Sequence, residues 1–157
     1  ANHKSFAAMH PWRYPGDVIE LNGLQQILWP IHCVQGSFGA EFAPGLNTDA
    51  FEKVFVKGTD TEIDSYSGFF DNGHRKATGL GDYLKEKSVE EVYILGLALD
   101  VCVKFTVLDA LGLGFKTYLV EDGCRGVNLN EGDSDKALSE MREKGAIIAQ
   151  SDQIITS

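Results

Sequence analysis

Residues 92–120 read VYILGLALDVCVKFTVLDALGLGFKTYLV, and this stretch decides the fold. The run 92–95 is apolar on both faces, as a strand buried in a parallel sheet requires. Residues 101–113 have the composition of a strongly apolar helix, and the run 117–120 predicts a second buried strand. A strand, a helix and a strand in this order predict two parallel strands joined by a right-handed crossover.

The same alternation continues on both sides of this unit. The sequence predicts strands over 54–56 and 146–149, and helices over 79–88 and 134–144. Strands that alternate with short helices are typical of an α/β fold whose parallel sheet is covered on both faces. We therefore expect a three-layer α/β/α architecture with a mainly parallel central sheet, and a single domain over residues 1–157.

Residues 1–50 differ from the rest of the chain, because they are rich in Pro, Gly and aromatic residues and have little periodicity. They predict a long ordered segment rather than a linker, since large aromatic side chains need burial. The aromatic residues in question are Phe6, Trp12, Trp29 and Phe38.

The composition narrows the possible function classes. With 43% apolar and 24% charged residues, the chain has the makeup of an ordinary globular protein, and no apolar run is long enough to span a bilayer. The net charge of −9, from 23 acidic and 14 basic residues, disfavours nucleic acid and membranes as partners. Three cysteines without a CxxC pair indicate a reducing compartment, so we expect a cytoplasmic protein.

The carboxyl end of the strand 92–95 leads into the most informative cysteine. Asp100 is a suitable helix N-cap and would place Cys102 in the first turn of the following helix. Free backbone N–H groups and the helix dipole favour a thiolate there and can bind an oxyanion. Cys102 is therefore a candidate nucleophile, and the alternative is a buried, inert cysteine, which is the commoner case.

The roles of the other candidate residues depend on which residues lie beside them in the fold. Lys57 ends the strand predicted over 54–56 and would lower the thiol pKa if it lay beside Cys102, but alone it is a solvated charge. His3 and His32 are too few for a metal site, which needs three or four protein ligands. Trp29 and Tyr66 can be pocket walls or core aromatics.

Four spaced segments form one further pattern. They are WPIHCVQG at 29–36, KG at 57–58 with DSYSGF at 64–69, GLALDVCVK at 96–104, and DGCRGV at 122–127. In this order they resemble the bacterial nicotinamidases (pyrazinamidases) of the isochorismatase-like hydrolase superfamily. The WPxHC element separates that group from the isochorismatases, which lack its metal site.

The resemblance implies an enzyme that hydrolyses nicotinamide, and pyrazinamide, through a cysteine thioester as part of NAD salvage. Cys102 matches the nucleophile and Lys57 matches the lysine of the catalytic triad. The backbone N–H groups of Ala98 and Cys102 match the oxyanion hole, and the family holds the Leu97–Ala98 peptide in cis.

The resemblance also implies a cofactor and a ring pocket. His3 and His32 match two ligands of one divalent metal ion, which is zinc, iron or manganese. Trp29 and Tyr66 match residues that surround the pyridine ring.

The remaining members of the family's site are expected upstream of Ala1. They are a catalytic aspartate and an Asp-x-His pair of metal ligands, so we expect the domain to be N-terminally incomplete. The expected partner is the small-molecule substrate, and the protein is expected to be a monomer or homodimer. Two alternatives stay open: a related hydrolase of another small amide or carbamoyl group, and an inactive fragment without the aspartate.

Overall fold

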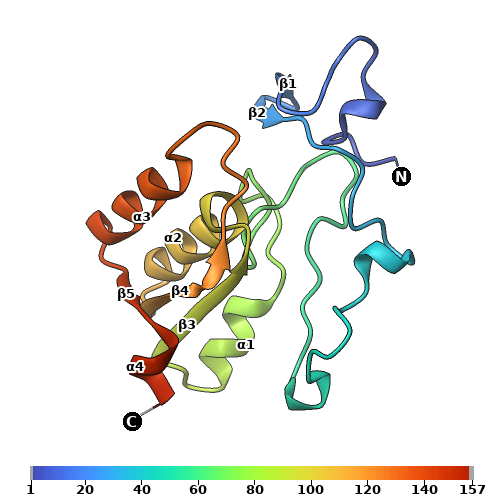
Figure 1. The fold of residues 1–157 in the computed structure, drawn as a ribbon. Coiled ribbons are helices and arrows are strands. Elements are labelled where there is room, and N and C mark those ends of the chain that lie inside the picture. Colours follow the sequence, from blue (N-terminus) through green and yellow to red (C-terminus); the bar gives the residue numbers. More distant parts are fainter. Residues whose placement is uncertain (1, 156–157) are drawn as a thin grey trace. The chain divides into compact units, whose positions relative to one another are not determined.

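The structure is a computed structural model that describes residues 2–155 (Figure 1). The chain forms two compact units, which meet in the sequence between Asp64 and Ser65. None of the helices within the described part is long and apolar enough to cross a membrane.

The second unit is built on the predicted strand–helix–strand stretch. Strand β3 (Glu91–Leu97) runs into a π-helical turn (Leu99–Val103), which continues as helix α2 (Lys104–Gly112) and leads to strand β4 (Lys116–Arg125). β3 and β4 pair in parallel, as the sequence predicts.

The rest of this unit extends the same pattern. Helix α1 (Leu80–Glu86) precedes β3, and helix α3 (Asp133–Glu143) leads to strand β5 (Ile147–Ala149). The sheet order is β3-β4-β5, with both pairs parallel. These elements confirm the predicted α/β class, whereas the short helix α4 (Ser151–Ile155) was not predicted.

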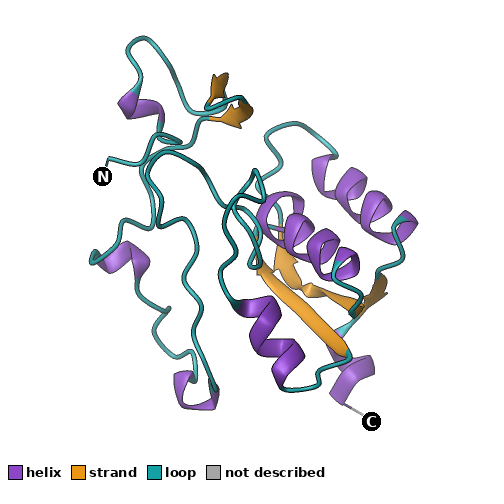
Figure 2. Cartoon of the chain, turned by 180° about the vertical axis from the view of Figure 1, so that it is seen from behind, coloured by secondary structure: helices purple, strands orange, loops and turns teal. Residues whose placement is uncertain are grey.

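Two apolar clusters hold the helices against one face of this sheet, with α2 in front of the strands in Figure 2. Val107 and Ala110 of α2 are fully buried, and Ile94 of β3 belongs to both clusters. The alternate residues of β3 point the other way and stay exposed, with Leu97 at 74% exposure. The period-two alternation of a strand explains this contrast.

The ladder between β3 and β4 is interrupted close to the end of β3. Ile94 pairs with Leu119, but the next pair joins Gly96 to Cys124, so β3 advances two residues while β4 advances five. A Cβ at Gly123 would lie 3.0 Å from Leu95 Cδ1 and 3.1 Å from Leu95 Cβ, so a larger residue within the interruption would force Leu95 to shift.

The first unit contains a small hairpin that was not predicted. Strands β1 (Val18–Leu21) and β2 (Leu24–Ile27) pair antiparallel across an Asn22-Gly23 turn. Both turn residues have positive φ, 52° and 81°, as a two-residue hairpin turn of the primed type requires. Three 3-10 helices complete the unit, at Ala7–Met9, Phe38–Ala40 and Thr48–Ala50.

Two predictions for the first unit are wrong. The run 54–56 forms no strand: Val54 and Val56 are exposed, and none of the ladders in the described part includes them, so its backbone lacks the pairing a strand needs. Trp12 and Phe38 are not buried either, being 92% and 80% exposed, whereas Phe6 is buried as expected. The aromatic content of residues 1–50 is therefore only partly core.

A pair of hydrogen bonds fixes the start of α4 to β4. Ser151 donates its hydroxyl and its backbone N–H to the Asp122 carboxylate, at 2.5 and 2.9 Å. These two bonds hold the pKa of Asp122 below its usual value of 3.8. The bonds favour the ionised carboxylate, so they stabilise the fold above the ordinary pKa, and this stabilisation is lost as the pH falls through the folded-state pKa.

We expect Ser151→Ala to raise the pKa of Asp122 part of the way toward its usual value, because only the hydroxyl bond is removed. The measurement is an NMR titration of the carboxylates. Asp133, whose pKa is lowered by the backbone N–H of Asn130, is the internal control and should not move. An unchanged Asp122 titration would show that the hydroxyl bond does not form in solution.

Candidate active site

Cys102 lies in the turn that connects β3 to α2. The backbone N–H groups of Val101 and Val103 both donate to the Ala98 carbonyl, at 3.1 and 3.0 Å, and the second of these bonds closes a π-type turn. π-helical turns recur at functional sites because they re-aim the side chains within them. Cys102 is partly exposed in this turn, and the Leu97–Ala98 peptide is cis, which confirms that expectation.

Asp100 has a different role from the one predicted. The residue at the N-cap position is Ala98, which makes no side-chain cap. The Asp100 carboxylate instead accepts the backbone N–H groups of Val127 and Asn128, at 2.8 and 2.7 Å. It therefore ties the loop after β4 to the turn that carries Cys102, and the predicted N-cap is wrong.

Cys124 has the environment of a structural cysteine. It is 3% exposed, and its thiol donates to the Val120 carbonyl at 3.3 Å. Burial raises the pKa of this thiol, so it resists forming a thiolate. Of the two cysteines in the second unit, Cys102 is therefore the better nucleophile.

Tyr66 belongs to the second unit and lies close to α2. Its ring contacts the ring of Phe105, with 5.4 Å between centroids, and its backbone N–H donates to Asn72 Oδ1 at 2.9 Å. Tyr66 is thus held near the helix that Cys102 precedes. Ala98, Cys102 and Tyr66 are the predicted site residues of this unit.

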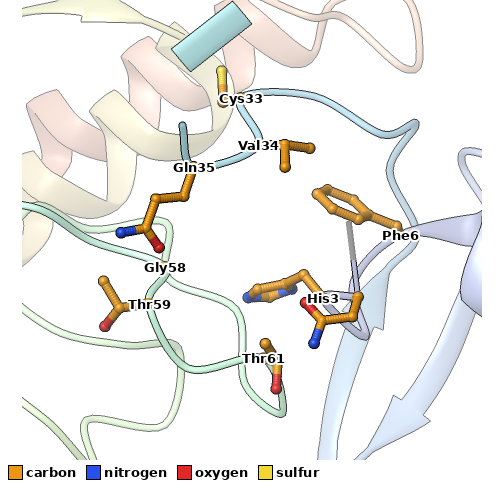
Figure 3. A pocket seen from close by; sticks show the side chains of 9 residues that line it. His3, Phe6, Cys33, Val34, Gln35, Gly58, Thr59 and Thr61 are labelled. Atoms are coloured by element: carbon orange, nitrogen blue, oxygen red, sulfur yellow. The ribbon is translucent and has the colours of Figure 1, made fainter. Parts of the chain in front are cut away.

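The first unit contains a cavity of about 290 Å³ next to His3. Its lining residues are Asn2, His3, Phe6, Cys33, Val34, Gln35, Gly58, Thr59 and Thr61 (Figure 3). The His3 ring lies between the Phe6 and Thr61 side chains in this view. Gly58 directly follows Lys57, so the Lys57 backbone lies near this cavity, whereas its side chain is exposed.

His3 has one satisfied and one unsatisfied ring nitrogen. The Ser5 backbone N–H donates to Nδ1 at 3.2 Å, and the Ser5 hydroxyl lies 2.8 Å from the same atom. Nε2 is buried and has no hydrogen-bond partner among the described residues. A buried ring nitrogen without a partner is unusual, and a metal ion bound to Nε2 would satisfy it.

His32 presents a matching nitrogen. Its Nδ1 lies 2.7 Å from the Pro30 carbonyl, which can only accept, so Nδ1 carries the proton and Nε2 carries the lone pair. A backbone carbonyl that fixes the ring in this way is typical of metal-ligating histidines. His32 and His3 both contact the Phe6 ring, with centroids 5.5 and 5.7 Å away.

The two histidines therefore fit two positions of a metal site. Within residues 2–155, no group of three or more His, Cys, Asp and Glu side chains is arranged to hold a metal ion. Trp29 lies beside them, because its backbone bonds with Ser5 and Ala7 at 2.8 and 2.9 Å. Ser5 and Phe6, which hold these rings, carry no sequence signal that identifies them.

The predicted residues thus form two sets, one in each unit. His3, Trp29, His32 and Lys57 belong to the first unit, and Tyr66, Ala98 and Cys102 belong to the second. That Lys57 lies beside Cys102 stays a prediction, with about 4–6 Å expected between Nζ and Sγ, the range over which a charge acts on a thiol.

Comparisons with known proteins point to one family. Residues 20–153 match the model of the isochorismatase domain. The nicotinamidase of Escherichia coli K12 is 50% identical over 151 residues, which are 94% of this chain and 69% of the relative's length.

Solved structures agree with this match. A structure described as an Acinetobacter baumanii nicotinamidase and pyrazinamidase has a TM-score of 0.94 and 45% identity, covering 98% of this chain and 73% of the other. The pyrazinamidase of Pyrococcus horikoshii in complex with zinc has a TM-score of 0.71 and 36% identity, covering 95% and 69%. These neighbours bear out the isochorismatase-like α/β fold.

We expect Asp100→Ala to lower the free energy of unfolding by about 1–3 kcal/mol, because it leaves two backbone N–H groups without their charged acceptor. The measurement is urea unfolding followed by circular dichroism. Glu131→Ala is the matched control, since Glu131 is an exposed carboxylate in the same loop between β4 and α3, and a change within about 0.5 kcal/mol is expected there. Equal effects of the two substitutions would contradict a stabilising link between the Asp100 carboxylate and the loop after β4.

Proposed function

Since the chain belongs to the isochorismatase domain family, we propose that it hydrolyses nicotinamide to nicotinate and ammonia, with pyrazinamide as a second substrate. The observation that carries the proposal is the place of Cys102, in the turn between β3 and α2. Half of the aligned residues are shared with a nicotinamidase, which favours this substrate over another small amide or a carbamoyl group.

Cys102 is the nucleophile in this proposal. Its thiolate attacks the amide carbonyl carbon. The C–N bond then breaks, and the leaving nitrogen takes up the proton that the thiol lost, so that ammonia is released. The resulting thioester is attacked by water, which releases nicotinate and returns the thiol. The backbone N–H groups of Ala98 and Cys102 are the proposed donors to the oxyanion, where preorganised dipoles stabilise the developing charge.

Lys57 and an aspartate complete the proposed triad. The aspartate, which the family resemblance assigns to the segment upstream of Ala1, takes the thiol proton. Lys57 is proposed to stabilise the Cys102 thiolate, since a nearby positive charge favours the ionised form of a thiol. Trp29 and Tyr66 are the proposed walls around the pyridine ring.

The proposed cofactor is one divalent metal ion, with zinc, iron and manganese as candidates. His3 and His32 would hold it through Nε2, together with the Asp-x-His ligands that the resemblance implies. When bound, the ion would help to orient the ring nitrogen. The unpaired, buried Nε2 of His3 and the proton position on His32 support this assignment.

The cellular setting is also part of the proposal. Nicotinate formation would serve NAD salvage in the cytoplasm, and reduced cysteines are compatible with that compartment. The protein would act on its small-molecule substrate as a monomer or homodimer, without nucleic acid or membrane. Residues 1–157 would belong to a single hydrolase domain.

We expect Cys102→Ala in the whole protein to lower kcat for nicotinamide by at least ~1,000-fold, because no other group replaces the nucleophile. Ammonia release is the measurement. Cys124→Ala is the control: it removes a buried thiol and should lower stability but keep kcat within several-fold. Full activity in Cys102→Ala would remove Cys102 from the mechanism.

We expect His32→Gln to lower the metal affinity of the whole protein by about 10–100-fold or more, because it removes the Nε2 lone pair. The metal content after dialysis, measured by elemental analysis, reports this directly. The control is His10→Gln, since the Nε2 of His10, the atom through which His3 and His32 would bind the metal, is already bonded to the Lys4 carbonyl at 2.7 Å. If His10→Gln lost as much metal as His32→Gln, the ligand assignment would be wrong.

A further inference from the structure

Thr106 lies one helical turn after Cys102, and its hydroxyl makes two hydrogen bonds. Oγ1 donates to the Cys102 backbone carbonyl at 2.7 Å and accepts the backbone N–H of Gly68 at 2.9 Å. The first bond is the common i−4 bond of a helical threonine. The second crosses 38 residues of sequence and reaches the loop that carries Tyr66.

Gly68 is held from both of its backbone groups. Its N–H bonds Thr106, and its carbonyl accepts the Thr78 hydroxyl at 2.7 Å. A Cβ at Gly68 would lie 3.4 Å from Thr106 Cγ2 and 3.6 Å from Leu80 Cδ2, within ordinary contact distance, so the loop backbone packs directly against α2 at this residue. Gly68 is therefore the point at which the loop is fixed to α2.

Tyr66 follows the same path. It lies two residues before Gly68, and its ring contacts Phe105, the helix residue adjacent to Thr106. The neighbouring Ser65 and Ser67 are buried, and the Ser67 hydroxyl accepts the Phe69 N–H at 3.0 Å, which stiffens the loop. Two consecutive residues of α2, Phe105 and Thr106, thus both contact the loop that carries Tyr66.

We infer that Thr106 is a positioning residue that sets Tyr66 relative to Cys102. Its hydroxyl joins the backbone of the nucleophile turn directly to the backbone two residues after the proposed ring wall. This inference rests on the proposed function, because Tyr66 matters here as a wall of the pyridine pocket. A helix and a loop joined through one hydroxyl hold the ring and the nucleophile in a fixed relation, which is what orientation in catalysis requires.

The test is Thr106→Val in the whole protein, which keeps the shape of the side chain and removes the hydroxyl. We expect KM for nicotinamide to rise roughly tenfold, with kcat falling by less than about threefold, because a loosened wall weakens ring binding. Alkylation of Cys102 by iodoacetamide, followed by peptide mapping, should stay within about twofold of wild type, since this small reagent needs no ring wall. The Gly68 amide should exchange its hydrogen faster.

Two variants separate positioning from general stability. Thr106→Ser keeps the hydroxyl, so we expect it to restore KM to within about threefold of wild type. Thr117→Val removes a fully buried hydroxyl that donates to the Phe115 carbonyl at 2.9 Å, so it should lower the melting temperature and leave KM unchanged.

Several outcomes would overturn the inference. They are a wild-type KM in Thr106→Val, a defect in Thr106→Ser as large as in Thr106→Val, or the same rise in KM from Thr117→Val. A wild-type protein that does not hydrolyse nicotinamide would instead overturn the proposed function, and the inference about Thr106 with it.

Discussion

The parallel pairing of β3 with β4 is the constraint on which the second unit depends. It places the carboxyl ends of both strands at one edge, and the register of the ladder shifts between the Ile94 and Gly96 pairs, just before β3 ends at Leu97. The chain then enters the π-helical turn at Leu99 and exposes Cys102 at that edge. Ligands of parallel sheets bind there because side chains from several strand ends converge.

Backbone-directed polar side chains hold the loops around this edge. Asp100 bonds the loop after β4, and Thr106 bonds the loop after residue 65, so the short helical stretch that contains Cys102 anchors two loops. Bonds to backbone groups fix a loop without depending on the loop's own side chains. The same principle holds for His32, whose ring is fixed by the Pro30 carbonyl.

The sequence predicts the second unit well because the apolar residues of its strands and helices pack against one another within that unit. The run 54–56 has the same β-forming residues but lacks a paired neighbour, so composition alone misleads there. The hairpin at 18–27 has short, half-polar strands, and Asn22-Gly23 is the one sequence feature that indicates it. The site residues were predicted from spaced motifs. Asp100 and Thr106 instead bond to loops that are distant in sequence, and local sequence patterns do not reveal such partners.

The most direct test of the central claim, that Cys102 attacks the amide carbon, is to trap the covalent intermediate. The whole protein is mixed with nicotinamide, quenched in acid during turnover and mapped by peptide mass spectrometry. The predicted result is a nicotinoyl group on the peptide that contains Cys102, absent in samples quenched after the substrate is exhausted. A nicotinoyl group on any other residue during active turnover would contradict the mechanism.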